Sequence, residues 1–176
     1  MILLFSDMDD LRLISLNRSI NMTKHKLIFL ILSCIWMVVI FYFSARDADE
    51  SEDDSYRVGL AVGRVFVPDF ESMSEDAQLE FAESIDHPVR KCAHATEYAI
   101  LGMFLVGVFY PVKKRSKSNI IYPLVCCVLY AATDEIHQLF VPGRSGQLFD
   151  VLIDGAGALV GILVIIFILE RIKMHK

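Results

Sequence analysis

The stretch LIFLILSCIWMVVIFYF, residues Leu27–Phe43, decides the fold class of this chain. Apart from Ser33 it is an unbroken apolar run, and about 17–25 such residues are enough for a helix to cross a bilayer. Lys26 and Tyr42 lie at its two ends and serve as interfacial anchors. The stretch therefore predicts a first membrane-spanning helix.

Three more apolar stretches follow, at residues 92–110, 120–141 and 151–169. Hydrophobic residues make up 55% of the 176 residues, whereas soluble domains have roughly 45–50%. We therefore expect an all-α fold, an integral membrane four-helix bundle. The lipid bilayer is its first expected partner, and no motif supports nucleic-acid binding.

Charged residues are distributed unevenly between these stretches. The segments before the first span, between the second and third spans, and after the fourth are basic, whereas the loop at residues 44–90 is rich in aspartate and glutamate. Basic segments stay on the cytoplasmic side, so we expect both termini to be cytoplasmic. Within the extracytoplasmic acidic loop, the apolar residues at 55–66 and the helix start at Ser74 predict short interfacial helices.

These features divide the chain into three parts. Residues 1–26 are expected to form a cytoplasmic N-terminal tail. The residues before Met22 do not resemble a signal peptide. We therefore expect either that translation starts at Met22 or that residues 1–21 belong to the cytoplasmic tail. Residues 27–170 form the four-span membrane domain, and residues 171–176 form a basic cytoplasmic tail.

Ionisable residues inside the spans need an explanation, because each costs roughly 2.5–3.5 kcal/mol at mid-membrane. The second span starts with His94, Glu97 and Tyr98 on one helical face. The end of the third span and the start of the fourth carry similar polar faces. Their residues are Asp134, His137 and Gln138 in the third span, and Asp150 and Asp154 in the fourth.

The direction of the spans brings these polar faces to the same side of the membrane. At about 1.5 Å per residue, Asp134 lies about 10 Å below the end of its span and Asp154 about 6 Å below the start of its own. Gly157 and Gly161 continue the face of Asp154 and favour close helix packing. We therefore expect one polar cluster in the outer leaflet, at the ends of spans two, three and four.

Three blocks of residues resemble the VanZ-like family of bacterial membrane proteins. The blocks are Arg90-Lys91-x-x-His94-x-x-Glu97-Tyr98, Asp134-Glu135-x-His137-Gln138-x-Phe140-x-Pro142-Gly143-Arg144 and Asp150-Val151-x-x-Asp154-x-x-Gly157. One departure is Arg46, where the family's pattern has glutamine. The resemblance implies a four-helix cell-membrane protein associated with the cell envelope. The founding member of the family is associated with low-level resistance to the glycopeptide teicoplanin.

The polar cluster supports three hypotheses about function. The first is an enzyme acting on a lipid-linked or cell-wall substrate, in which imidazole serves as base or nucleophile and arginine holds phosphate or carboxylate. The second is a binding or accessory protein for an anionic headgroup, a cell-wall precursor or a glycopeptide antibiotic. The third is a buried ion-pair network that fixes helix register, although buried pairs are poor stabilisers.

The candidate site residues divide between two roles. The candidate catalytic residues are His94, Glu97, Asp134, Glu135, His137 and Asp154. The candidate substrate-binding residues are Arg90, Lys91, Tyr98, Gln138, Arg144 and Asp150. No residue is assigned to a metal, although the histidines and carboxylates are ligand types that a divalent ion accepts. Metal dependence, the substrate and the presence of enzymatic activity are left open by the sequence.

Overall fold

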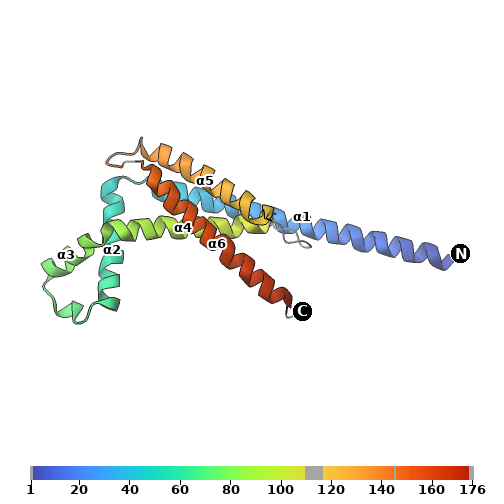
Figure 1. Ribbon diagram of the computed structural model, residues 1–176, viewed down its shortest axis with the longest axis horizontal. Coiled ribbons are helices and arrows are strands. Elements are labelled where there is room, and N and C mark those ends of the chain that lie inside the picture. Colours follow the sequence, from blue (N-terminus) through green and yellow to red (C-terminus); the bar gives the residue numbers. More distant parts are fainter. Residues whose placement is uncertain (1, 110–116, 145, 175–176) are drawn as a thin grey trace.

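The structure, a computed structural model, describes residues 2–109, 117–144 and 146–174. These residues form six α-helices and one short 3₁₀ helix, with no strand among them. The elements are α1 (Ile2–Ser44), α2 (Ala48–Phe66), η1 (Phe70–Ser72), α3 (Glu75–Ser84), α4 (Asp86–Phe109), α5 (Ser118–Gln138) and α6 (Leu148–Met174). Figure 1 shows α1 and α4 running along one direction, with α5 inclined to them and α6 crossing them obliquely.

Four helices are long and apolar enough to cross a membrane. They are the Thr23–Ser44 part of α1, all of α4 and α5, and the Leu148–Ile172 part of α6. The predicted all-α architecture with four spans is confirmed. Helix α1 also includes the residues before Thr23, which the sequence analysis assigned to a tail, and the proposed start at Met22 stays a prediction.

Helix α4 starts at Asp86, before the apolar stretch that predicted it at residue 92. The carboxylate of Asp86 lies in the first turn, where a negative charge stabilises the positive end of the helix dipole. Arg90 Nη2 donates to Asp86 Oδ2 at 2.5 Å, one turn further along. The polar start of the second span is therefore helical, and it presents its side chains from a rigid backbone.

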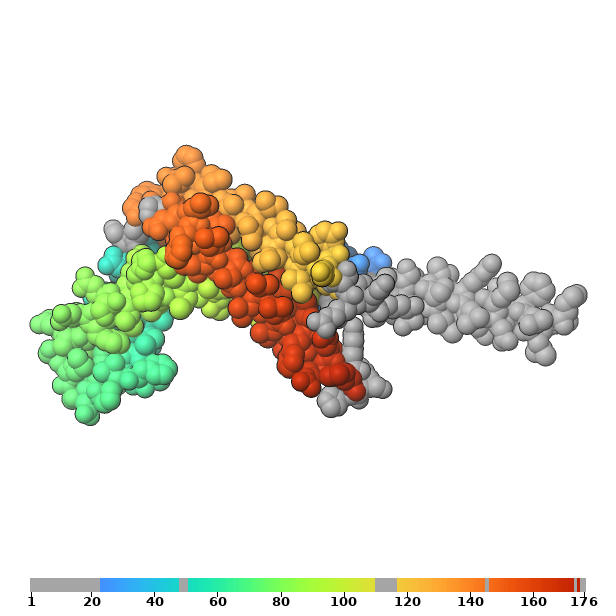
Figure 2. Space-filling view, in the orientation of Figure 1, coloured from blue at the N-terminus to red at the C-terminus, as the bar shows by residue number. Residues whose placement is uncertain are grey.

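Helix α4 is the centre of the bundle. It makes its most extensive contacts with α6 and α1, and α5 packs on both α6 and α4. Tyr98 and Leu101 of α4 are fully buried with Ile40 of α1, Ala131 of α5 and Ala158 of α6 in one core cluster. Figure 2 shows the outer surface of α6 lying across this face of the molecule.

Small residues allow α4 and α6 to pack closely. A Cβ atom added at Gly157 or Gly161 would collide with the backbone carbonyl oxygen of Ala95 or Ala99. Their role in close helix packing, which the sequence predicted, is thus present in the structure. The same face of α6 carries Asp154 into the bundle, where it is fully buried.

The acidic loop between the first two spans is largely helical. Helix α2 begins at Ala48, before the predicted residue 55. Helix α3 begins where it was expected, and Ser74 Oγ accepts a hydrogen bond from the Ala77 N–H at 3.4 Å. Figure 1 shows α2 lying crosswise to the spans at the end of the bundle. This orientation suits a helix that lies along a membrane surface.

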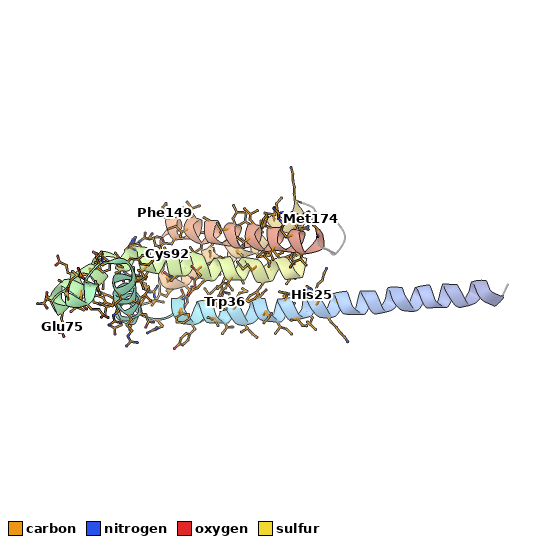
Figure 3. All side chains as sticks on the ribbon, turned by 90° about the horizontal axis from the view of Figure 1, so that it is seen from below. His25, Trp36, Glu75, Cys92, Phe149 and Met174 are labelled. Atoms are coloured by element: carbon orange, nitrogen blue, oxygen red, sulfur yellow. The ribbon has the colours of Figure 1, made fainter. Side chains whose placement is uncertain are left out.

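The outward faces of the spans are apolar. Val38, Leu129 and Val160 are between 60% and 67% exposed, which suits contact with lipid rather than with water. Figure 3 shows His25 and Met174 at one end of the spans and Glu75 at the other end of the molecule. The chain is a multi-pass membrane protein with its connecting helices α2 and α3 at one end.

Candidate functional site

The polar side chains gather where α1 and α5 end and where α4 and α6 begin, a region that we call the polar end. Lys91 Nζ of α4 donates to Asp150 Oδ1 of α6 at 2.6 Å. Gln138 Nε2 of α5 donates to Ser44 Oγ of α1 at 3.0 Å. These two bonds join all four spans in pairs at the polar end. The three polar faces expected from the sequence therefore meet in the structure.

A pocket of about 190 Å³ opens at the polar end, bounded by α1, α2, α4 and the loop between α5 and α6. Arg46, Arg90 and Arg144 line it, and each comes from a different segment of the chain. Its other lining residues are Phe43, Ser51, Asp54, Ser55, Val58, Val89, Ala93, His94 and Glu97. The pocket thus combines a basic wall with an apolar one.

Two of the three arginines are paired with carboxylates close to the pocket. Arg46 forms an ion pair with Asp54 of α2. Arg90 pairs with Asp86 in its own helix. Ser55 of α2 donates to the other oxygen of Asp86. These contacts tie α2 to the start of α4 and hold it over the pocket.

Arg144 differs from the other two arginines. Its Nε atom is buried and has no hydrogen-bond partner, and among the described residues its guanidinium forms no ion pair. Burial lowers the pKa of the Arg144 guanidinium below its usual range, and the nearby Arg90 lowers that pKa further. Asp134 and Glu135 are near enough to raise this pKa but form no ion pair with the half-buried guanidinium, and a cation held out of water without a direct partner is costly. An anion in the pocket would reduce this cost.

His94 and Glu97 share one face of α4, as their spacing predicted, and both line the pocket. His94 Nδ1 lies 3.8 Å from Glu97 Oε2, which is too long for a hydrogen bond. The Trp36 indole N–H donates to the backbone carbonyl of Glu97 at 2.8 Å, fixing this turn of α4 against α1. An imidazole near a carboxylate in a basic pocket is suited to proton transfer.

Asp134 and Asp154 lie deeper in the bundle than the pocket. Gln138 Nε2 donates to Asp134 Oδ2 at 3.4 Å. In the part of the chain that the structure describes, Asp134 Oδ1, both carboxyl oxygens of Asp154 and the Tyr98 hydroxyl have no hydrogen-bond partner. Both aspartates interact electrostatically with Tyr98. These groups form a buried polar cluster next to the pocket.

A sequence model of the VanZ/LLP1 family matches residues 29–169 of the chain. The chain belongs to the VanZ/LLP1 family. The match extends through all four spans, so the resemblance predicted from the three polar blocks is confirmed. Comparisons with curated proteins and with solved structures found no match.

Two candidate catalytic residues of this VanZ/LLP1 family member have partners outside the pocket. Glu135 Oε2 accepts a hydrogen bond from the Gln147 N–H at 2.7 Å, which fastens the loop between α5 and α6. The His137 ring lies against Phe41 of α1 with ring centroids 4.6 Å apart. These contacts hold the α5–α6 loop and helix α1 at the polar end. Neither Glu135 nor His137 lines the pocket.

The candidate substrate-binding residues also separate into two groups. Arg90 and Arg144 line the pocket of this VanZ/LLP1 family member. Lys91 does not line it, because its ammonium pairs with Asp150 and lies 5.1 Å from the centre of the Phe149 ring. Tyr98 and Gln138 belong to the buried polar cluster and its link to α1.

Sequence reasoning missed Arg46 as a pocket residue. Arg46 stands where the family's pattern has glutamine, and that departure by itself indicates no role. Its position two residues after Ser44, at the end of the first span, was the available signal, because that span also ends at the polar end. Ser55 and Asp54 of α2 were missed as well, since nothing in the sequence indicates that α2 folds over the pocket.

No metal site is assigned in this VanZ/LLP1 family member. Among the side chains that the structure describes, no three from His, Cys, Asp or Glu converge as metal ligands. The described residues around the small pocket offer three guanidinium groups, one imidazole and the carboxylates of Asp54 and Glu97.

Proposed function

We propose that this VanZ/LLP1 family member binds the phosphate-type headgroup of a cell-envelope molecule in the pocket at its polar end. The observation that carries the proposal is the buried Nε atom of Arg144, which has no partner among the described residues and lies beside Arg46 and Arg90. Guanidinium groups bind phosphate and carboxylate with two parallel hydrogen bonds. The three arginines converge from separate segments, and Arg144 is the one whose guanidinium forms no ion pair among the described residues.

The extracytoplasmic location of the pocket is part of this proposal. The segments at residues 24–26, 113–117 and 171–176 are basic, and all three connect to span ends opposite the polar end. Basic segments of this kind stay in the cytoplasm. The polar end would then face the outside of the cell, with both termini inside.

The size of the pocket supports a headgroup over a larger ligand. About 190 Å³ is less than the roughly 300–1,000 Å³ of pockets that enclose drug-sized molecules. A whole glycopeptide therefore does not fit inside it. The teicoplanin resistance associated with the family would then act through an envelope molecule, a lipid-linked or other cell-wall precursor, rather than through capture of the antibiotic.

Hydrolysis or transfer at the bound phosphate is a second candidate function. It is favoured by His94, which lines the same pocket as the arginines and has an unpartnered Nδ1 atom near Glu97. In such a reaction His94 would remove a proton from the attacking water or hydroxyl, and the arginines would stabilise the charge on the phosphoryl oxygens.

The structural alternative, a self-neutralising ion-pair network, has less support. In this alternative the charged residues neutralise one another, and they are Arg90, Glu97, Asp134, Arg144 and Asp154. Among the described residues, Arg144, Asp134 and Asp154 form no ion pair. The ion pairs that do form at the polar end do not include Arg144, which leaves its guanidinium available to a ligand.

Binding of inorganic pyrophosphate to the purified full-length protein in nanodiscs tests the proposal. Arg144→Gln should weaken binding about 10- to 100-fold, because a hydrogen bond to a charged group contributes roughly 1.5–3 kcal/mol. Arg57→Gln is the matched control, since Arg57 is exposed on α2, lies outside the pocket and gives the same charge change. Equal losses in both variants, or no binding by the unaltered protein, would contradict the proposal.

A further inference from the structure

We infer that the ligand of the pocket is a membrane lipid whose hydrocarbon chain leaves the pocket sideways, over Phe43 and Val58. The inference rests on the proposed binding of an anionic headgroup and names the chemical class of the molecule that carries it. A water-soluble phosphate compound is the alternative.

The composition of the pocket wall favours an amphiphilic ligand. Phe43, Val58, Val89 and Ala93 line the pocket together with the arginines. A site for a small soluble anion has no use for such a wall, because apolar surface contributes nothing to binding phosphate. An amphiphile, in contrast, uses both kinds of wall.

The apolar residues Phe43 and Val58 lie on the side of the pocket that faces the bilayer boundary. Phe43 lies in the last turn of the first span, and Val58 lies on the crosswise helix α2 (Figure 1). Phe43 is 43% exposed and Val58 is 49% exposed. At the boundary of the bilayer, these exposed faces meet hydrocarbon rather than bulk water. The apolar side of the pocket is therefore continuous with the lipid phase.

The arginines and the small volume of the pocket determine which part of a lipid can enter it. Arg46, Arg90 and Arg144 provide the basic wall, and about 190 Å³ leaves room for a headgroup alone. The remainder of a larger ligand must lie outside the pocket. The apolar residues at its border provide a path along which a chain can stay in the bilayer while the phosphate contacts the arginines.

Photo-crosslinking of the full-length protein in phosphatidylcholine nanodiscs tests the inference. The probe is phosphatidic acid with a diazirine close to the glycerol end of one chain. Illumination should label the peptides containing Phe43 and Val58, and excess pyrophosphate should reduce this labelling at least about tenfold. Diacylglycerol with the same diazirine, which lacks the phosphate, should not label these peptides above background.

A pair of uncharged substitutions on α2 separates the chain path from the phosphate site. Val58→Asn should reduce labelling by phosphatidic acid by a larger factor than it reduces the affinity for pyrophosphate, because Val58 lines the apolar side of the pocket. Val65→Asn should change neither, because Val65 is 72% exposed on the same helix and lies outside the pocket. Labelling that is equal for both lipids, or that pyrophosphate does not displace, overturns the inference. Failure of pyrophosphate to bind at all overturns the proposed function instead.

Discussion

At the scale of single residues, hydrogen-bond partners separate the ionisable side chains of the polar end into two groups. Lys91 and Glu135 have partners that hold helices and a loop in place. His94, Arg144 and Asp154 have buried polar atoms without partners in the described chain. Buried groups without partners are costly, and in a membrane protein they mark candidate functional sites.

The sequence could predict which residue types gather at the polar end, but not which of them lack partners. Helical spacing places His94 and Glu97 on one face, and the direction of the spans brings Asp134 and Asp154 to the same end. The pairing of Glu135 with the Gln147 N–H depends on the conformation of a loop that no periodic pattern describes. The assignment of catalytic roles to these residues stays a prediction.

His94→Asn tests the catalytic candidate at the residue scale. Asparagine remains polar and similar in size but cannot act as a base near neutral pH, so we expect pyrophosphate affinity to change by less than about threefold. Any release of phosphate from a lipid phosphate should fall about 10²- to 10⁴-fold. His87→Asn is the control, because His87 is exposed in the first turn of α4 and outside the pocket.

Two outcomes of this comparison decide between enzyme and binding protein. If the unaltered protein binds pyrophosphate and releases no phosphate from lipid phosphates, the binding function stands alone. If His94→Asn releases phosphate at the unaltered rate, His94 has no catalytic role.

At the scale of elements, the sequence predicted the spans well and the connecting helices only partly. Long apolar runs specify where a helix crosses the bilayer, and the four spans lie where these runs are. The start of α4 at Asp86 and of α2 at Ala48 fell outside the predictions, because the polar and acidic residues there carry no apolar periodicity. The lid-like placement of α2 comes from contacts such as that between Ser55 and Asp86, which only the structure shows.

Substitution of two glycines in α6 tests the packing that buries Asp154. Gly161→Ala should destabilise the protein by about 1–3 kcal/mol, because the new methyl group collides with the backbone of Ala99. Gly155→Ala should be neutral or stabilise by up to about 1 kcal/mol, because its methyl group meets only a side-chain methyl of Val128 at 3.3 Å. Reversible unfolding in mixed micelles measures both. Equal stability of the two variants would contradict the close α4–α6 contact.

At the scale of the whole molecule, four apolar helices place the chain in a membrane, and the unequal loops predict its orientation. The net charge of −5 conceals this distribution, because basic residues concentrate on one side and acidic residues on the other. The sequence therefore predicted the fold class and the gathering of polar residues at one end of the spans, whereas the outer-leaflet location stays a prediction. The sequence could not predict the pocket, because its wall is made of Arg46, residues of α2 and Arg144, which lie in separate segments that come together only on folding.

Cysteine labelling in intact cells tests the orientation. Glu75 and His25 lie toward opposite ends of the molecule (Figure 3) and are both exposed. In a background with the four native cysteines replaced, a membrane-impermeant maleimide should label Glu75→Cys. It should label His25→Cys only after the membrane is permeabilised. Labelling of His25→Cys alone in intact cells would show that the polar end faces the cytoplasm.

The central claim is that the three pocket arginines form an anion site, and crystals of the full-length protein grown with tungstate test it most directly. Tungstate is a heavy analogue of phosphate, and its anomalous scattering locates it without reference to the protein atoms. We predict a peak within hydrogen-bond distance of the Arg144 guanidinium, between it and Arg46 and Arg90. A well-ordered polar end without a peak there, in which Arg144 pairs with Asp134 or Asp154, would contradict the claim and support a purely structural network.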